Sequence, residues 1–187
     1  MNYLSLAIAL LAASSTAFCA ETLSIDASHS AVVFSWNHRG YSHPLARFEK
    51  IDGKLLLDRA DLTKSTVWIT LPLAGLRTGD EHLDKRLKGA EFLDAAAYPT
   101  ITFKSTQVEA LDPDTLRIKG DLSVHGITRS VVLDTHVNKI SADAGEDLTA
   151  GFDANAAIRR SDFGITRYVP MVTDQLAVHI TVEAHRG

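Results

Sequence analysis

Cysteine is almost absent from this sequence, because Cys19 is the single one and lies just after an apolar N-terminal run, residues 4–18. The run is too short to cross a bilayer comfortably and ends in small residues, as the apolar region of a secretory signal peptide does. Residues 1–3 contain no Lys or Arg, so only the terminal amine supplies the positive charge usual in such a leader. We predict a signal peptide over residues 1–19 and export to the periplasm, with cleavage after Ala20 or lipidation of Cys19 as alternatives.

The mature chain, residues 20–187, then contains no cysteine, which excludes disulfides and thiol chemistry. An excess of positive charge is also missing: 19 Lys and Arg against 23 Asp and Glu leave a formal net charge of −4, which gives no attraction to nucleic acid. Internal repeats, low-complexity runs and linkers are absent as well. With 45% hydrophobic residues, the chain is long enough to form one domain whose core is stable without disulfides.

Motifs of known catalytic sites are missing too. No G-x-S-x-G segment is present, so the sequence offers no nucleophile elbow for serine hydrolysis. The eight histidines are scattered, with no two at a spacing that would bind a metal on one helix. We therefore expect no catalytic residue, no bound metal and no cofactor; a hydrolase acting on a lipid or isoprenoid ester is the enzymatic alternative.

One segment predicts a helix. Leu83, Leu87 and Phe92 recur at roughly helical spacing, and acidic residues at positions 80 and 81 favour a helix start. Pro99 disfavours helical geometry for Tyr98, so we expect the helix to end there and a strand to follow at once. This short amphipathic helix is predicted to lie as a lid against a structure that is otherwise all strand.

Alternation of apolar and polar residues predicts the strands, and it is clearest over residues 66–73. Phe48 is out of step with Ile51, Leu55 and Leu57, which suggests a bulge near Glu49. The predicted strands cover residues 24–37, 48–58, 66–73, 101–105, 116–124, 127–137, 151–158 and 175–184. About eight antiparallel strands with one apolar face each predict an all-β barrel wide enough for one small ligand; a two-sheet sandwich with a solid core is the alternative.

The apolar faces are core in a filled barrel and the wall of a pocket in an open one. The inward positions that we predict to contact a ligand are Val32, Phe34, Trp36, Ile69, Leu71, Phe103, Leu122, Val131, Leu133 and Val178. His38, Tyr41 and Arg160 are candidates for a polar contact with a head group near the mouth. The Arg159-Arg160 pair suits an anionic head group, but Asp162 could equally cap the turn and pair with Arg160.

Several short segments, in order along one domain, resemble the YceI-like family of polyisoprenoid-binding-type periplasmic proteins. The segments are Ile25-Asp26 with His29-Ser30, His38-Arg39-Gly40-Tyr41-Ser42, Phe48 with Asp52-Gly53, Asp84 with Leu87, Ala90-Glu91-Phe92-Leu93-Asp94, Tyr98-Pro99, Thr102-Phe103-Lys104-Ser105, Gly120-Asp121-Leu122, His125-Gly126-Ile127-Thr128 and Arg160-Ser161-Asp162-Phe163-Gly164. Together they span nearly all of residues 23–184.

The resemblance implies a lipocalin-like antiparallel barrel with a helix beside it, whose long apolar cavity holds an isoprenoid or another long-chain lipid. We therefore expect residues 20–187 to form a lipid-binding domain that transports or stores its ligand in the periplasm. A stress-related structural module with a filled barrel is the non-binding alternative. Transient contact with a membrane surface and assembly as a homodimer are left open by the sequence.

Overall fold

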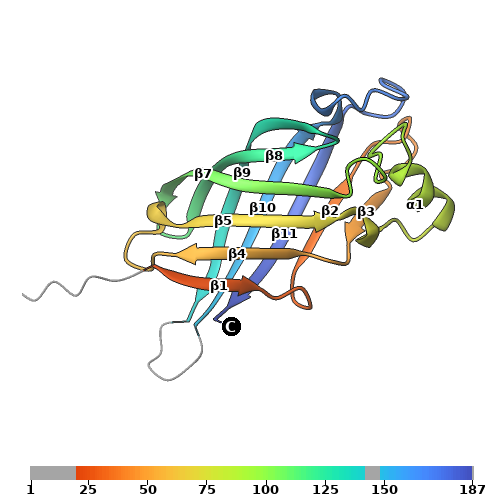
Figure 1. Ribbon diagram of the computed structural model, residues 1–187. Coiled ribbons are helices and arrows are strands. Elements are labelled where there is room, and N and C mark those ends of the chain that lie inside the picture. The colour runs from red at the N-terminus through yellow and green to blue at the C-terminus, as the bar shows by residue number, and fades with distance from the viewer. Residues whose placement is uncertain (1–19, 142–147, 187) are drawn as a thin grey trace, which may run out of the picture.

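The computed structural model describes residues 20–141 and 148–186, which form one long, strongly twisted antiparallel sheet rolled into a barrel (Figure 1). The predicted signal peptide and most of the polar segment after Ile140 lie outside the described residues. The strands are β1 (Glu21–Ile25), β2 (Ala31–Ser35), β3 (Leu45–Phe48), β4 (Asp52–Leu57), β5 (Thr66–Pro72), β6 (Leu76–Arg77), β7 (Thr100–Asp112), β8 (Thr115–Val124), β9 (Ile127–Ile140), β10 (Thr149–Arg159) and β11 (Gln175–His185).

The barrel closes through eight strands in the order β1-β4-β5-β7-β8-β9-β10-β11, because β1 also pairs with β11. Every pairing is antiparallel, which confirms the predicted eight-stranded antiparallel barrel. Closure leaves no free edge along most of the sheet, so the backbone N–H and C=O groups of the long strands are paired on both sides.

The remaining strands, β2, β3 and β6, continue the barrel wall in line with β1, β4 and β5. β11 pairs with β2 through Ala177–Thr181 and then with β1 through Ala184 and His185, so β1 and β2 act as two halves of one strand. β3 pairs with β2 and with β6 in the same way. Each of these three wall positions is therefore occupied by two short strands with an irregular segment between them.

The predicted bulge near Glu49 is one of these breaks, and not a bulge within a continuous strand. β3 ends at Phe48, β4 begins at Asp52, and the two segments pair with different strands. The break lets Phe48 and Ile51 both point inward although they are three residues apart, and they are only 5% and 3% exposed. A strict period of two would have placed one of them outside.

Among the described residues there is one α-helix, α1 (Glu81–Lys88), accompanied by three short 3₁₀ helices, η1 (Leu62–Lys64), η2 (Leu73–Gly75) and η3 (Arg160–Phe163). The Asp80 carboxylate caps α1 by accepting a hydrogen bond from the Leu83 amide at 2.8 Å. The predicted helix end at Tyr98 was wrong, because α1 ends at Lys88. Residues 89–98 form turns instead, in which the Leu93 amide donates to the Leu87 carbonyl at 3.0 Å.

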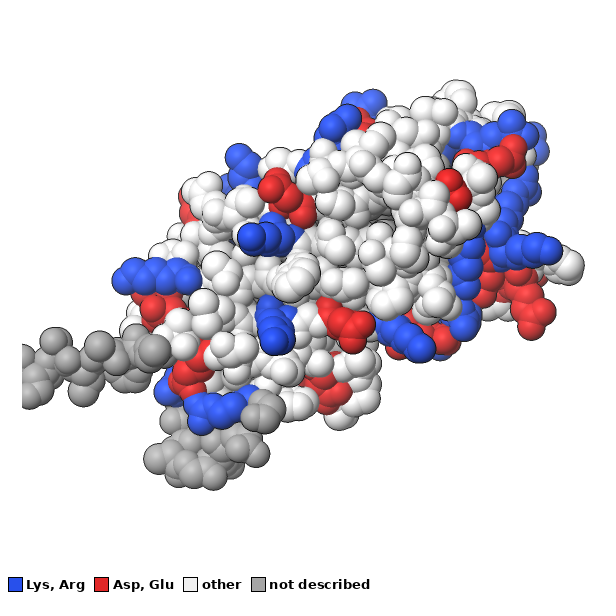
Figure 2. Space-filling model, in the orientation of Figure 1, with Lys and Arg blue, Asp and Glu red and all other residues white. Residues whose placement is uncertain are grey.

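Outside the barrel, basic and acidic side chains are interspersed over the wall, and charges of both signs gather over α1 (Figure 2). Inside, one apolar cluster surrounds Leu71, Leu76 and Phe163, and a second one surrounds Leu23, Leu57 and Ala184 at the end away from α1. In the part of the chain that the structure describes, no helix has the length and apolar character needed to cross a membrane.

Candidate ligand-binding cavity

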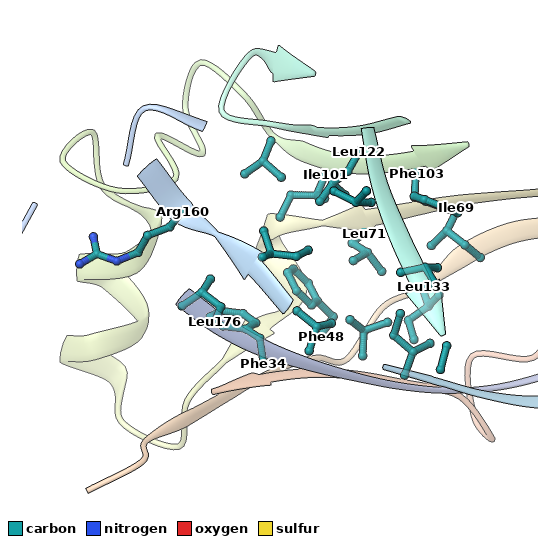
Figure 3. A pocket seen from close by; sticks show the side chains of 18 of the residues that line it. Phe34, Phe48, Ile69, Leu71, Ile101, Phe103, Leu122, Leu133, Arg160 and Leu176 are labelled. Atoms are coloured by element: carbon teal, nitrogen blue, oxygen red, sulfur yellow. The ribbon is translucent and has the colours of Figure 1, made fainter. Parts of the chain in front are cut away.

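Between the two apolar clusters the barrel is hollow and encloses a cavity of about 600 Å³. Aliphatic and aromatic side chains from opposite walls point toward this space (Figure 3). Its volume falls within the range of roughly 300–1,000 Å³ that is typical of pockets for drug-sized ligands. The described structure therefore has an open barrel, and the alternatives of a solid sandwich and of a barrel filled by its own side chains do not apply.

The wall is apolar because the alternation along each strand sends one set of side chains inward. On β8, Leu116, Ile118 and Leu122 line the cavity, whereas Arg117 and Lys119 are exposed on the outer surface. The neighbouring strand β9 is registered so that Val131 is opposite Gly120, which keeps the inward faces of the two strands level. A shift of one residue would turn charged side chains into the cavity.

Glycine makes room for the larger side chains of the wall. A Cβ atom on Gly120 would lie 2.4 Å from the Phe103 ring, and one on Gly53 would lie 2.6 Å from the Ile69 side chain. Real Cβ atoms do not approach so closely, so either substitution would push a wall side chain into the cavity. The shape of the cavity thus depends on small residues placed opposite large ones.

Twelve of the thirteen residues predicted to contact a ligand line the cavity, and a ligand-binding role for them stays a prediction. The twelve are Val32, Phe34, Trp36, His38, Ile69, Leu71, Phe103, Leu122, Val131, Leu133, Arg160 and Val178. Tyr41 is outside the lining, and its side chain is 85% exposed. The prediction also omitted Phe48, Ile101 and Leu176, which line the cavity too; the alternation pointed to Ile101 and Leu176, whereas Phe48 was out of step with the residues after it.

The mouth of the cavity lies beneath α1, the turns after it and the loop between η3 and β11. Tyr168 in this loop connects the two segments: Arg86 of α1 donates a hydrogen bond to its hydroxyl, and the Phe92 ring centroid lies 6.3 Å from its ring. The Arg167 guanidinium lies 4.8 Å from the Tyr168 ring centroid and forms an ion pair with Glu91 at 3.4 Å. These contacts form a latch across the mouth, which we define as Arg86, Glu91, Phe92, Arg167 and Tyr168.

Arg160 lines the cavity near the mouth, but most of its hydrogen-bonding capacity is already used. Its guanidinium donates to the carbonyls of Ile165, Arg167, Val172 and Thr173 at 2.8–3.1 Å. A guanidinium has five N–H groups, so only one is left for a head group. Figure 3 shows this side chain at one end of the lining, apart from the apolar residues. Burial lowers the pKa of Arg160 from its ordinary value.

Of the two alternatives for this turn, the pairing of Asp162 with Arg160 was wrong, because the acidic partner of this turn is Asp174. The Asp174 carboxylate accepts hydrogen bonds from the Ser161 amide at 2.8 Å and from the Ser161 hydroxyl at 2.6 Å. It also forms an ion pair with Arg159 at 3.2 Å, whereas Asp162 is exposed. Burial by itself would raise the pKa of Asp174, but the hydrogen bonds from Ser161 and the neighbouring Arg159 together outweigh it and lower the pKa. Both arginines of the predicted pair therefore hold the turn together.

The chemistry of the lining offers little for catalysis. Among the described residues, no Asp or Glu lines the cavity, although Ser65, Thr66, Thr135 and His38 do. A Ser-His-acid triad needs a carboxylate to orient the histidine, and the cavity wall does not provide one. The Ser65 oxygen accepts a hydrogen bond from the Asp58 amide at 3.0 Å, which ties this side chain to the backbone of the neighbouring turn.

One group outside the cavity has donor atoms that could approach a metal ion. Asp26, His29 and Glu183 each offer a ligand atom, all within 4.8 Å of one another, at the break between β1 and β2. The Asp26 carboxylate is already bonded to His29 Nδ1 at 2.6 Å and to the Ser28 amide at 2.8 Å. These hydrogen bonds close the turn that lets β11 change its pairing from β2 to β1.

Comparison with known proteins agrees with this architecture. Residues 23–184 match the family model of the YceI-like domain. A UPF0312 protein of Vibrio cholerae is 33% identical over 164 residues, which cover 86% of this chain and 87% of the relative. A UPF0312 protein of Azotobacter vinelandii is 31% identical over 183 residues, covering 98% and 95%.

Solved structures show the same fold at lower sequence identity. BcnA of Burkholderia cenocepacia superposes with a TM-score of 0.76 at 20% identity, over 85% of this chain and 98% of that one. The YceI protein of Campylobacter jejuni gives a TM-score of 0.72 at 24% identity, over 81% and 90%. A polyisoprenoid binding domain from Saccharophagus degradans gives 0.69 at 15% identity, over 88% and 98%. On the strength of the family model and the UPF0312 relatives, this chain belongs to the YceI-like family.

Proposed function

We propose that this protein binds a long-chain amphiphilic lipid of the isoprenoid class in its barrel cavity and carries or stores that lipid in the periplasm. The observation that carries the proposal is the apolar cavity of about 600 Å³, walled by inward side chains of nearly every strand. The polyisoprenoid binding domain of Saccharophagus degradans, which has the same fold, supports the choice of ligand class. The lack of a carboxylate in the described lining favours binding over hydrolysis.

Chain length should govern the affinity. Each buried methylene contributes roughly 0.8 kcal/mol, and association costs on the order of 4–15 kcal/mol before any net affinity appears. A tail of about fifteen carbons supplies about 12 kcal/mol as an upper value by the same transfer figure. Useful binding therefore begins at about three isoprene units or a comparable acyl chain.

The test is a titration of the purified protein with prenyl alcohols of increasing length and one constant head group. We expect no binding of the shortest alcohol and rising affinity with each added unit until the cavity is filled. Organic extraction of the protein purified from its own cell envelope, followed by mass spectrometry, identifies a resident lipid. An affinity that does not change with chain length, together with an extract that contains no lipid, would contradict the proposal.

Location and membrane contact are part of the same proposal. Three large apolar side chains on the two loops at the mouth are exposed, Tyr41 at 85%, Met171 at 57% and Val169 at 37%, and they suit a brief contact with a bilayer from which lipid is taken. Cell fractionation and N-terminal sequencing of the mature protein test export and cleavage after Cys19. Recovery of the uncleaved chain in the cytoplasm would contradict the periplasmic role.

A further inference from the structure

The charged residues that line the cavity all carry the same sign. The whole chain has more acidic than basic residues, 23 against 19. Yet the lining described here contains Arg39, Arg86 and Arg160 and no Asp or Glu. In a mouth with apolar, weakly polarisable walls, charges of one sign produce a focused field. That field attracts anions and repels cations.

Two of these three arginines have capacity for a ligand. Arg160 is held by four backbone carbonyls, but neither Arg39 nor Arg86 forms an ion pair with any described carboxylate. Arg39 is exposed, and its backbone amide is fixed by the Met171 carbonyl at 3.1 Å, which places its Cα beside the mouth. Arg86 contacts Tyr168 through one hydrogen bond and through a stacking distance of 5.0 Å to the ring centroid.

Tyr168 adds a neutral donor at the same place. Its oxygen accepts from Arg86, so its own O–H can donate to a further acceptor. The Arg167 and Arg86 guanidiniums beside it lower the pKa of the phenol, which strengthens it as a donor. Beside the Arg167–Glu91 ion pair, the mouth therefore presents two guanidiniums without an ion-pair partner among the described residues, and one phenol, around the entrance of an apolar cavity.

We infer that the cavity selects amphiphiles with an anionic head group, held by Arg39 and Arg86 while the chain fills the barrel. The chemical class is a long prenyl or acyl chain ending in a phosphate or a carboxylate, since guanidinium groups match both oxyanions in geometry and charge. This inference depends on the proposed function, because the chain must bind before its head group can be compared.

The test keeps the chain constant and changes only the head group. Geranylgeraniol, geranylgeranyl phosphate and geranylgeranylamine are titrated against the mature protein at neutral pH, and hexadecanol and palmitate form a second series. We expect the phosphate to bind about tenfold more tightly than the alcohol, a preference equivalent to about 1.4 kcal/mol, and the amine to bind more weakly than either. The preference should shrink with added salt. The two series distinguish the sources: a preference for the anion in only one of them assigns the ligand to that head group.

The variants Arg39→Gln and Arg86→Gln assign the effect to the mouth. The double variant should bring the ratio of the phosphate and alcohol affinities close to one. The ratio is the readout because Arg86 also belongs to the latch, whose loss affects both ligands alike. Arg86→Lys, which retains the charge, should keep part of the preference. Arg117→Gln, which removes an exposed arginine paired with Asp134 on the outer wall, should change neither affinity.

Each outcome has a distinct meaning. Equal binding of alcohol, phosphate and amine by the wild type overturns the inference and leaves the lipid-binding function standing. A preference for the anion that survives in the double variant also overturns it, since the selecting charges would then lie elsewhere. If no member of either series binds, the proposed function fails, and the inference falls with it.

Discussion

The effect of a single residue on ligand binding and stability depends on whether its side chain faces the cavity or the outer surface of the barrel. Leu122 and Lys119 lie on the same strand, but Leu122 lines the cavity and Lys119 is exposed. A residue on the inner face contributes to the ligand site and to the core at once. A residue on the outer face contributes mainly to solubility.

The first prediction compares these two positions. Leu122→Asp places a carboxylate in an apolar cavity and should lower the free energy of unfolding by about 2–5 kcal/mol and abolish binding of a geranylgeranyl probe. Lys119→Asp should leave both within experimental error. Urea denaturation and probe fluorescence are the measurements. Equal damage from the two variants would mean that β8 is buried on both of its faces, and damage from Lys119→Asp alone would mean that its register is shifted by one residue.

The turn between β1 and β2 supplies a prediction about pH. The hydrogen bond and the charge of Asp26, with a smaller contribution from Glu183, raise the pKa of His29 above 6.5. Hydrogen bonds from Ser28 and His29 lower the pKa of Asp26 below its ordinary value of 3.8. The stabilisation from His29 is therefore present below about pH 6.5 and is lost as pH rises through the higher folded pKa; that from Asp26 is present above about pH 4 and is lost as pH falls through the lower one.

The measurement is an NMR titration of the His29 ring in the wild type and in two variants. Asp26→Asn should bring the midpoint back toward its ordinary value, and Glu183→Gln should move it less, because Asp26 is the larger cause. A wild-type midpoint at the ordinary histidine value would show that the bond between Asp26 and His29 does not persist in solution.

At the scale of elements, the short helix and the loop after η3 matter because they close the mouth together. α1 is too short to be stable as an isolated helix and depends on its tertiary contacts, among them Leu83, Leu87 and the latch. The latch joins α1 and the turns after it to a loop more than seventy residues later in the chain, as the hydrogen bond between Arg86 and Tyr168 shows. Ligand exchange therefore requires that these contacts separate, or that the mouth opens beside them.

Removing the tyrosine tests this role. Tyr168→Ala deletes two cation–π contacts worth roughly 0.5–1 kcal/mol each and should speed ligand exchange by about fivefold to thirtyfold. Stopped-flow competition between a fluorescent prenyl probe and an unlabelled ligand measures the rate. Trp68→Ala is the matched control, because this exposed aromatic residue lies on the outer face of β5, outside the cavity lining. Exchange that is equally fast in the wild type and in Tyr168→Ala would assign the entrance to another part of the barrel.

At the scale of the whole molecule, the hollow core means that folding and binding are coupled. An open apolar cavity forgoes the contacts that a filled core would have, and a ligand chain supplies them when it binds. A ligand that binds only the folded state at about a hundred times its Kd adds about 2.7 kcal/mol to the free energy of unfolding. For a chain of this size, that corresponds to a rise of about 5–11 °C in the melting temperature.

We therefore expect saturating geranylgeraniol to raise the melting temperature by this amount in a calorimetric scan. Geraniol, with half as many isoprene units, is the control and should raise it little. An unchanged melting temperature with both alcohols, under conditions where binding is seen by fluorescence, would mean that the ligand binds the unfolded chain about as well as the folded barrel.

The sequence by itself determined the inward faces of most strands, because alternation is a local property that survives without knowledge of the partner strand. It joined β1 and β2 into one strand over residues 24–37 and ended β7 too early, at residue 105. It placed Phe34, Leu71 and Leu122 on the cavity wall, and it marked the start of α1 at Asp80. It could not place the end of α1. There, amides that follow the helix take the carbonyls of Leu87 and Lys88 and close it with turns.

Only the tertiary structure showed that the sheet closes into a barrel and which segments of the chain form the mouth of the cavity. The hydrogen bond that the Asn37 amide donates to the Thr173 hydroxyl at 3.0 Å joins residues 136 positions apart. Periodicity along the chain cannot predict such a pair. The same reason explains why the sequence proposed Arg160 as the contact for a head group. The loop from Ile165 to Thr173 folds so that four carbonyls converge on Arg160, which leaves Arg39 and Arg86 as the cations that face the cavity.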